Sequence, residues 1–352
     1  MKILLAGGYG FFEYEEVYAR SLESMGVDVI RFSWATYFKG LIGRIEQRLI
    51  IPGWATQRFE KDLLAFARDH RPDVIWIWRG LQVRPQLVSQ LKQKTGAIMI
   101  SYGVDDTFNP AYGAHAWFLR PNIWKWFIAS IKEYDINFVY RPVNIEEYKM
   151  HGAVRVELLL PSFIRDRHRE VVLSDQEKEV YECDIVFVGH YEPDGRDECL
   201  RLLVEKGFDV KLWGSNLEWT RNVLGNLYYE KLAPIHKVEG DEYAKALSGA
   251  KVCLCFLSKL NRDTYTRRCF EIPACGKVML AERTDDLLEF FKEDEEACFF
   301  STTEELISKA QWLIHNPDIR ERIAKAGQRR VWVDGHDAES RAKTLLEHIR
   351  SK

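Results

Sequence analysis

The sequence predicts an α/β protein of two Rossmann-like domains, each a doubly wound parallel sheet, that face each other across a cleft. Its 352 residues are enough for two domains of ordinary size. Short apolar runs alternate with amphipathic segments, which is typical of a parallel sheet covered by helices on both faces. The alternation begins again after a polar stretch at 161–182 that starts with a proline, which indicates a linker.

The first domain is expected over residues 1–165. It opens with an apolar run at 2–6 that stops at Gly7-Gly8-Tyr9-Gly10, and Val17, Leu22 and Met25 then follow at helical spacing. Continuously apolar runs predict further strands at 27–32, 73–78, 97–102, 138–140 and 156–160, with helices at 59–69 and 86–94.

The second domain is expected over residues 166–335. Strands are predicted at 184–188, 209–213, 251–256 and 277–280, with helices at 197–206, 242–248 and 266–274. Ser301-Thr302-Thr303-Glu304 fits a capping box, and Asn316-Pro317 fits a helix cap followed by proline at the first helical position. A final helix within 336–352 could pack back on the first domain.

Composition excludes several classes of protein. Apolar residues make up 46% of the chain, which excludes a wholly disordered protein, and a net charge of −3 argues against nucleic acid as a partner. No stretch has the length or apolarity of a signal peptide or a membrane span. The seven cysteines, all in the second half, form no paired CxxC motif, so we expect buried, reduced thiols in a cytoplasmic protein.

Charge is unevenly divided along the chain. Residues 1–150 carry 19 Lys and Arg against 16 Asp and Glu, a net charge of +3, so the remainder carries 31 against 37, a net charge of −6. The acidic half nevertheless contains the densest group of cations, between Lys259 and Arg268. Net charge by domain is therefore a poor guide to where an anion would bind.

The strongest candidate site is the segment after the strand at 251–256. Lys259, Asp263, Thr264 and Tyr265 precede Arg268 here, and four cations in ten residues border a predicted helix start that would favour a diphosphate. Eight positions after Asp263, Glu271 could accept hydrogen bonds from the two hydroxyls of a ribose. The alternative is a solvated basic helix start in which Glu271 pairs with Arg267 or Arg268.

A second candidate is the turn after the strand at 184–188. Gly189 and His190 lie in this turn, and Arg196 begins the next helix, where it could add a counter-charge to a phosphate held by backbone N–H groups. Because the turn holds a single glycine, no dinucleotide fingerprint is present, and an ordinary tight turn explains it equally well.

The first domain offers an acceptor side. Asp105 and Asp106 follow the strand at 97–102, where one carboxylate could take a proton from a sugar hydroxyl. A divalent metal or a cap for the next turn are the alternatives. We place Gly8, Tyr9 and Arg79 on the same side, because they follow the strands at 2–6 and 73–78.

Two stretches combine aromatic, aliphatic and cationic residues: 37–58 and 116–132. Either could lie on a membrane surface or hold a lipid-linked or glycan acceptor. Helices packed on the sheet, with their Lys and Arg side chains reaching solvent, are the alternative.

The run Arg268-Cys269-Phe270-Glu271-Ile272-Pro273-Ala274-Cys275-Gly276 resembles the spore maturation protein CgeB-like glycosyltransferases, which belong with the group 1 transferases of GT-B architecture. The similarity extends over nearly the whole chain and is dense from residue 180 onward. Its other segments are Pro72–Ile75, Asp105-Asp106, Asp184–Gly189 with Arg196, Lys211–Gly214, Val238–Gly240 with Glu242-Tyr243, and Phe299–Leu346.

The resemblance implies a transfer of sugar from a nucleoside-diphosphate sugar, most simply a UDP-sugar, to a glycan, lipid-linked or protein acceptor. It places the ribose on Glu271, the diphosphate between Arg196 and Arg268, the base near Val238, and Trp213-Gly214 on the donor side. The first Glu of the family's paired motif falls on Asp263, a departure that weakens the case for a retaining mechanism. The family needs no tightly bound cofactor or metal, since cations neutralise the leaving diphosphate.

The mechanism and two other functions stay open at this stage. Asp105 or Asp106 would be the base if the reaction inverts configuration, whereas both would only orient the acceptor if it retains configuration. A sugar-nucleotide epimerase could use the same architecture, and a non-catalytic spore or surface-associated protein would bind no nucleotide. We expect a cytoplasmic protein that could lie at the inner face of the membrane.

Overall fold

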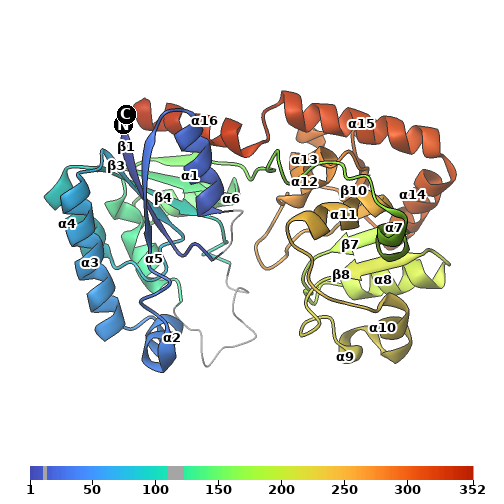
Figure 1. Cartoon of the computed structure of the whole chain (residues 1–352), viewed down its shortest axis with the longest axis horizontal. Coiled ribbons are helices and arrows are strands. Elements are labelled where there is room, and N and C mark those ends of the chain that lie inside the picture. The colour runs from blue at the N-terminus through green and yellow to red at the C-terminus, as the bar shows by residue number, and fades with distance from the viewer. Residues whose placement is uncertain (11–13, 110–122, 352) are drawn as a thin grey trace. The chain divides into compact units, whose positions relative to one another are not determined.

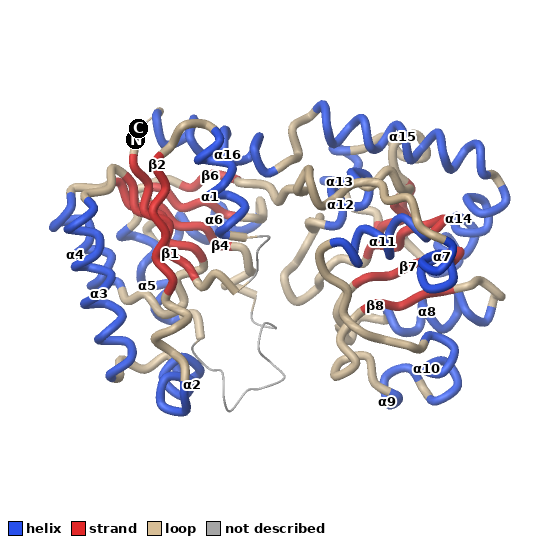
Figure 2. Tube along the Cα trace, viewed as in Figure 1, coloured by secondary structure: helices blue, strands red, loops and turns tan. Residues whose placement is uncertain are grey.

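The computed structural model describes residues 1–10, 14–109 and 123–351, which divide into two compact units (Figure 1). Unit 1 comprises Met1–Leu160 and Ala338–Lys352, and unit 2 comprises Pro161–Asp337. Each unit is a parallel sheet with helices on both faces (Figure 2), so the predicted pair of Rossmann-like domains is confirmed. Among the described residues, no helix has the length and apolarity needed to span a membrane.

Unit 1 is built on a six-stranded sheet in the order β2-β1-β3-β4-β5-β6, with every pair parallel. Its strands are β1 (Lys2–Gly7), β2 (Asp28–Ser33), β3 (Val74–Trp78), β4 (Ile98–Gly103), β5 (Ile136–Val139) and β6 (Val156–Leu158). Its helices are α1 (Glu15–Ser24), α2 (Gly40–Leu49), α3 (Trp54–His70), α4 (Pro85–Thr95), α5 (Lys125–Ser130), α6 (Val143–Met150) and α16 (Ala338–Arg350), with a 3₁₀ turn at Ile131–Glu133. The fully apolar runs become β3 and β1, which lie inside the sheet and are buried on both faces.

Unit 2 is built on a five-stranded parallel sheet in the order β11-β10-β9-β7-β8. Its strands are β7 (Cys183–Val188), β8 (Val210–Trp213), β9 (Ala250–Cys255), β10 (Met279–Glu282) and β11 (Cys298–Phe300). Its helices are α7 (Asp175–Tyr181), α8 (Arg196–Glu205), α9 (Arg221–Leu224), α10 (Asn226–Leu232), α11 (Asp241–Gly249), α12 (Arg268–Ala274), α13 (Asp285–Phe290), α14 (Thr303–His315) and α15 (Pro317–Val333). Its main core lies between the sheet and the helices that include α8 and α14.

The starts of three helices in unit 2 can be compared with the sequence-based expectations. The stretch expected to be a linker contains α7, whose N-terminus has a complete capping box between Ser174 and Glu177. The cap of α14 lies one residue later than expected, because Thr302 accepts the hydrogen bond of the Glu305 N–H. Asn316 does precede Pro317 at the start of α15, as predicted.

The cysteines behave as small apolar side chains. Six of the seven are buried and all are free, which confirms the expected buried thiols. Cys253 and Cys255 lie on β9, and the sulfur of Cys255 is 3.8 Å from that of Cys269. Burial raises the pKa of the Cys253 thiol to about 12, so this thiol is protonated and unreactive at neutral pH.

The strand orders locate a switch point in each sheet. In unit 1 the chain leaves β1 toward β2 on one side, and β3 returns to the other side of β1. In unit 2 the same reversal occurs at β7, which pairs with β8 on one side and with β9 on the other. Ligands of open parallel sheets bind at the carboxyl ends of the strands beside such reversals, so these loops are where the site residues should lie.

Candidate functional site

The switch point of unit 2 brings together two segments that are far apart in sequence. Gly189 follows β7, and Phe256 and Leu257 follow the neighbouring strand β9. The loops that continue from these two ends, 189–195 and 256–267, contain six of the twelve donor-side residues predicted from the sequence. The fold therefore places the first and second sequence candidates next to each other.

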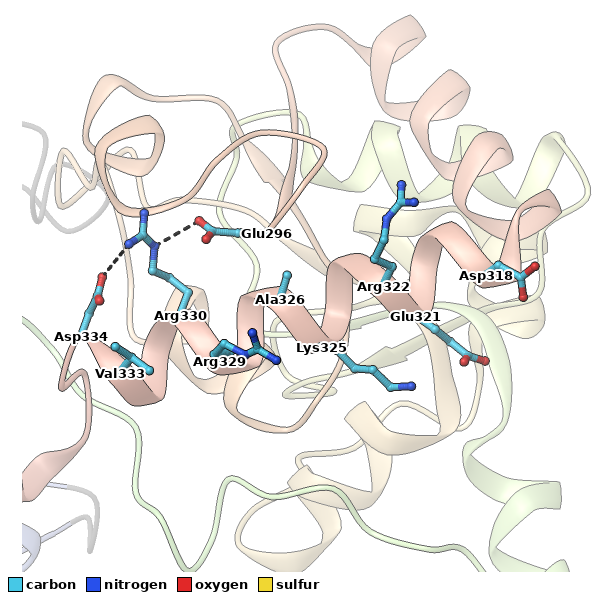
Figure 3. Close-up of a pocket in the computed structure, with 10 residues that line it drawn as sticks. All are labelled: Glu296, Asp318, Glu321, Arg322, Lys325, Ala326, Arg329, Arg330, Val333 and Asp334. Carbon is cyan, nitrogen blue, oxygen red and sulfur yellow. Dashed lines mark hydrogen bonds and ion pairs between the residues drawn. The ribbon is translucent and has the colours of Figure 1, made fainter.

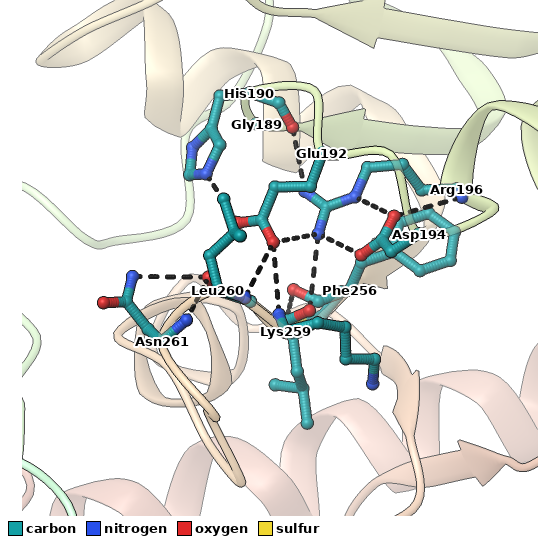
Figure 4. A network of polar contacts seen from close by, with 12 residues as sticks. Gly189, His190, Glu192, Asp194, Arg196, Phe256, Lys259, Leu260 and Asn261 are labelled. Atoms are coloured by element: carbon teal, nitrogen blue, oxygen red, sulfur yellow. Dashed lines mark hydrogen bonds and ion pairs between the residues drawn. The ribbon is translucent and has the colours of Figure 1, made fainter. Parts of the chain in front are cut away.

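Arg196 lies at the centre of a buried polar network that joins these two loops (Figure 4). Its guanidinium forms an ion pair with Asp194 at 2.6 Å and donates to the backbone oxygens of His190 at 2.9 Å and Leu257 at 3.3 Å. The arginine side chain is only 3% exposed. The donors of Arg196 are thus directed at the protein itself, and the side chain ties the turn after β7 to the loop after β9.

Glu192 completes this network from the same turn. Its Oε2 accepts hydrogen bonds from the backbone N–H groups of Lys259 at 3.1 Å and Leu260 at 3.4 Å, and Arg196 lies 3.7 Å away. Burial would raise the pKa of Glu192, but hydrogen bonds from His190 and Ser258 and the charge of Arg196 lower it to about 2. Sequence reasoning missed Glu192, because nothing in its spacing distinguishes it from a solvated acid.

Glu271 lies in a second buried cluster, on α12. Its Oε2 accepts from the Tyr243 hydroxyl at 2.8 Å, and its Oε1 accepts from Arg267 Nε at 2.9 Å. The Nε2 of His168 is 3.8 Å from the same Oε1. Burial would raise the pKa of Glu271, but the charges of Arg267, His168 and Arg268 and the Tyr243 hydrogen bond hold it near 2, so the carboxylate is ionised.

Arg268 differs from its neighbours in what it contacts. Its Nε is buried and has no hydrogen-bond partner among the described residues. Tyr243 and Glu271 are the groups whose charges act most strongly on it. A buried guanidinium nitrogen without a partner is costly, so Arg268 is the donor-side cation best suited to hold an anionic ligand.

The other donor-side residues fall into three groups. Lys259 forms an ion pair with Glu282 at 2.8 Å, the hydroxyl of Thr264 bonds to Asp286, and the side chain of His190 is 55% exposed. Tyr265 is buried against Phe270 and Phe290, so it belongs to the core. Asp263 is half-buried, and its N–H donates to the Ser258 oxygen.

Trp213 ends β8, and Gly214 follows it, next to Gly189. Trp213 is buried against Tyr181 and His236. Val238, two residues after His236, is also buried. A Cβ at Gly214 would lie 2.4 Å from the Gly189 oxygen and 2.7 Å from the Trp219 ring, so only glycine fits here. This close approach explains the glycine that the sequence pattern singled out.

In unit 1 the two adjacent aspartates have different surroundings. Asp106 is completely buried and accepts hydrogen bonds from the Phe108 N–H at 3.2 Å and the Asn144 amide at 3.0 Å, as a residue that caps a turn does. Asp105 forms an ion pair with Arg79, and its side chain is 19% exposed. The structure thus brings Arg79 and Asp105 together and leaves Asp106 a local structural role.

Gly8 and Tyr9 follow β1, but Glu15 already occupies their backbone donors. Its Oε1 accepts the N–H of Gly8 at 2.8 Å and of Tyr9 at 3.2 Å. The Tyr9 hydroxyl donates to the Leu5 oxygen at 3.0 Å. Because the Glu15 carboxylate already accepts these two N–H groups, the turn is unsuited to bind a phosphate. This arrangement is consistent with an acceptor side and argues against a second nucleotide site.

Two hollows in unit 2 contain none of the predicted site residues. One, of about 650 Å³, runs along α15, where Arg330 bonds to Glu296 and Asp334 (Figure 3). The other, of about 900 Å³, lies at the amino ends of β7 and β9.

In the described ranges no group of three or more His, Cys, Asp or Glu is arranged to hold a metal ion. The part of the stretch 116–132 that covers residues 116–122 lies outside the described residues.

This chain is similar to one protein family over part of its length and to several solved structures over nearly all of it. Residues 196–347 match the family model described as "Glycosyl transferase-like". A comparison with curated protein sequences finds no match.

Similar solved structures cover the chain from end to end. Sucrose-phosphate synthase from Thermosynechococcus elongatus aligns with a TM-score of 0.73 and 14% identity over 100% of this chain and 98% of that one. HepE from Anabaena in complex with UDP-glucose aligns with a TM-score of 0.67 and 11% identity over 100% of both chains. A glycosyltransferase from Rickettsia africae aligns with a TM-score of 0.68 and 13% identity over 99% and 98%. The family-model match covers residues 196–347, which is less than half of the chain, and the solved structures show that the whole chain has the GT-B fold.

Proposed function

We propose that this protein transfers a hexosyl or related glycosyl group from a nucleoside-diphosphate sugar, bound by unit 2, to an acceptor hydroxyl bound by unit 1. The observation that carries the proposal is the pair of Arg268 and Glu271 on α12, beside the loop that follows β9. The buried Nε of Arg268 has no hydrogen-bond partner in the part of the chain that the structure describes, and the buried Glu271 offers an ionised carboxylate. A cation and an anion arranged in this way suit a diphosphate and the hydroxyls of its ribose.

Glu271 can receive a ribose hydroxyl without losing its present contacts. Each carboxylate oxygen has two acceptor positions. Arg267 contacts Oε1 through both Nε at 2.9 Å and Nη2 at 2.7 Å, whereas the Tyr243 hydrogen bond uses one position of Oε2. A ribose hydroxyl could therefore donate to the second position of Oε2. Tyr243 and Arg267 would then act as positioning residues that fix the carboxylate, while Arg196 and Glu192 fix the loop at 257–260.

The donor we propose is a UDP-sugar. HepE, whose fold this chain shares, was solved with UDP and with UDP-glucose. Arg268 would neutralise the departing diphosphate without a tightly bound metal or other cofactor, so chelation of divalent ions should not reduce the rate. Val238, Trp213 and Gly214 stay proposed for the donor side near β8, and His190, Lys259, Asp263 and Thr264 for the loops at the switch point.

On the acceptor side we propose Asp105, with Arg79 holding its carboxylate, as the group that contacts the reacting hydroxyl. It is the general base if the reaction inverts configuration and the orienting group if it retains configuration. Gly8 and Tyr9 stay proposed to line the same side. The acceptor is a glycan, a lipid-linked molecule or a protein of the type modified by CgeB-like enzymes, and the free cysteines support a reducing, cytoplasmic compartment.

Calorimetry with UDP, GDP, CDP, ADP and dTDP tests the donor site directly. We expect UDP to bind best and Arg268→Gln to weaken its binding by about tenfold or more, because a charge-assisted hydrogen bond is lost. Arg201→Gln, on the outer part of α8 in an ion pair with Asp197, is the matched control and should bind UDP as the wild type does. Equal UDP affinity of wild type and Arg268→Gln would refute the assignment of Arg268.

Product analysis separates the remaining functions. A UDP-sugar converted to its epimer without any acceptor would show an epimerase and contradict sugar transfer. A protein that binds none of the five nucleotides would be non-catalytic. Release of UDP that depends on an added acceptor is the result expected of a transferase.

A further inference from the structure

Unit 1 carries an exposed apolar surface on α2 and the start of α3, which Figure 1 shows beside each other. Leu41 is 77% exposed, and Ile42 and Trp54 are each 68% exposed. We call this the α2 surface, and its six large apolar side chains are Leu41, Ile42, Ile45, Leu49, Ile51 and Trp54. Leu41, Ile45 and Leu49 follow one another at four-residue spacing, so they share one face of α2. A group of neighbouring exposed apolar side chains on one surface helix indicates an interaction site.

The other face of α2 is held firmly against unit 1. A Cβ at Gly43 would lie 2.8 Å from the backbone of Phe38, so the helix packs closely there. Glu46 is buried and accepts hydrogen bonds from the N–H groups of Ala55 at 3.1 Å and Thr56 at 2.9 Å, at the start of α3. Since the glycine and the buried acid fix the inner face, the apolar residues are held pointing outward.

The exposed charged side chains between positions 37 and 59 are all basic. Lys39, Arg44, Arg48 and Arg58 are all exposed. Glu46 is the one acidic residue between positions 37 and 59, and its carboxylate is turned inward. Arg58 lies over the Trp54 ring, 5.6 Å from its centroid, with Asp62 at 3.8 Å from its Nε. An occupant of this surface must therefore accept apolar side chains and carry negative charge.

We propose that the α2 surface binds the face of a membrane that contains anionic lipids, with α2 lying in the plane of the interface. The apolar residues would enter the boundary between headgroups and acyl chains, while Arg44 and Arg48 reach lipid phosphates. Trp54 has the amphipathic ring that is favoured at this depth. An ordinary protein partner would offer no opposite charge to Lys39, Arg44 and Arg48 unless it were acidic. This inference does not depend on glycosyl transfer.

Co-sedimentation of the full chain with vesicles tests the proposal. We expect binding to vesicles of phosphatidylcholine mixed with phosphatidylglycerol, weaker binding in high salt, and little binding to phosphatidylcholine alone. Replacing both Arg44 and Arg48 by Gln should lower the partition coefficient by about tenfold or more. The variant Leu41→Glu/Ile45→Glu should abolish binding, because it places carboxylates on the apolar face.

The matched control is Met150→Glu/Val154→Glu. These two residues are 75% and 79% exposed on another part of unit 1, so the control adds the same charge to the same unit. It should bind vesicles like the wild type, and both variants should keep the unfolding midpoint. Failure of the wild type to bind anionic vesicles would overturn the proposal. So would an equal loss of binding in Leu41→Glu/Ile45→Glu and in the control Met150→Glu/Val154→Glu. So would a wild-type dimer in light scattering that Leu41→Glu/Ile45→Glu converts to monomers, since a second copy would then cover the surface.

Discussion

The sequence alone does not decide whether Glu271 is a ligand for a ribose or a partner in a salt bridge. The sequence offered a ribose ligand or a salt bridge to Arg267 or Arg268, and the structure contains the contact with Arg267. Tyr243 and His168, which also face this carboxylate, lie far from it in sequence, and no spacing rule connects them. Residue type and position after a strand suggested Glu271, but only the fold reveals the groups that keep it ionised.

We expect Glu271→Gln to lower the free energy of unfolding at neutral pH by about 3 kcal/mol, because buried cations lose their counter-charge. The pKa of Glu271 falls from 4.5 to about 2 on folding, so its stabilising effect is complete above about pH 5. That effect is lost as the pH falls from about 4.5 to about 2. Urea unfolding of both proteins across this range should show the difference shrinking toward acid, and a difference independent of pH would contradict the assignment.

The two aspartates after β4 predict opposite consequences of substitution. Asp105→Asn should lower kcat by about a hundredfold or more with little change in the unfolding midpoint, since the side chain is partly exposed and next to Arg79. Asp106→Ala should instead lower the free energy of unfolding by about 2 kcal/mol, because it leaves buried donors without an acceptor. Steady-state kinetics and urea unfolding check the pair. A fully active Asp105→Asn enzyme would exclude the base and the orienting role alike.

At the scale of elements, the strands were predictable because buried parallel strands are continuously apolar. The runs at 2–6, 73–78 and 184–188 lie where β1, β3 and β7 are found. The sequence pattern predicts no helix at α5, α7 or α9, which are seven residues or shorter, because such helices show too little periodicity. The cap of α14 was misplaced by one residue since three adjacent residues, Ser301 to Thr303, all have capping side chains.

The loop after β9 depends on α8 for its position, which gives Arg196 a testable role. Arg196→Lys keeps the charge but loses the fork that bonds Asp194 and two backbone oxygens. We expect the free energy of unfolding to fall by about 2 kcal/mol and UDP affinity to fall with it. Arg201→Lys on the same helix should change stability by less than about 0.5 kcal/mol.

The alternative role for Arg196 predicts another result. If its guanidinium contacts the diphosphate directly, Arg196→Lys would weaken UDP binding while leaving stability unchanged. Chemical denaturation and calorimetry on the same samples therefore decide between a positioning residue and a ligand contact.

At the scale of the whole molecule, two domains and a final helix were predictable from length and from the repeated alternation. The pattern of the final helix alone does not decide which unit contains it. The structure assigns α16 to unit 1, where it packs against α1 and where Arg155 donates to the His348 oxygen at 3.0 Å. An amphipathic helix has a buried face wherever it packs, so its pattern alone does not identify the partner.

Leu345→Ala tests this assignment. Leu345 is fully buried on α16, so its truncation should cost about 2–4 kcal/mol of stability. Hydrogen exchange should accelerate in α1 and α16 and stay unchanged in unit 2. Val333→Ala, 76% exposed at the end of α15, is the control and should have no effect on either unit. Faster exchange confined to unit 2 would contradict the division of the chain.

The return of α16 has a consequence for how the protein is made. A ribosome releases residues 1–160 of unit 1 before any of unit 2, whereas α16, which packs against α1, emerges only after all of unit 2. Unit 2 is a continuous segment and can complete its fold while unit 1 still lacks α16. Unit 1 thus starts to emerge before unit 2 but completes its fold after it, so a truncation that removes α16 would damage the domain built from residues 1–160.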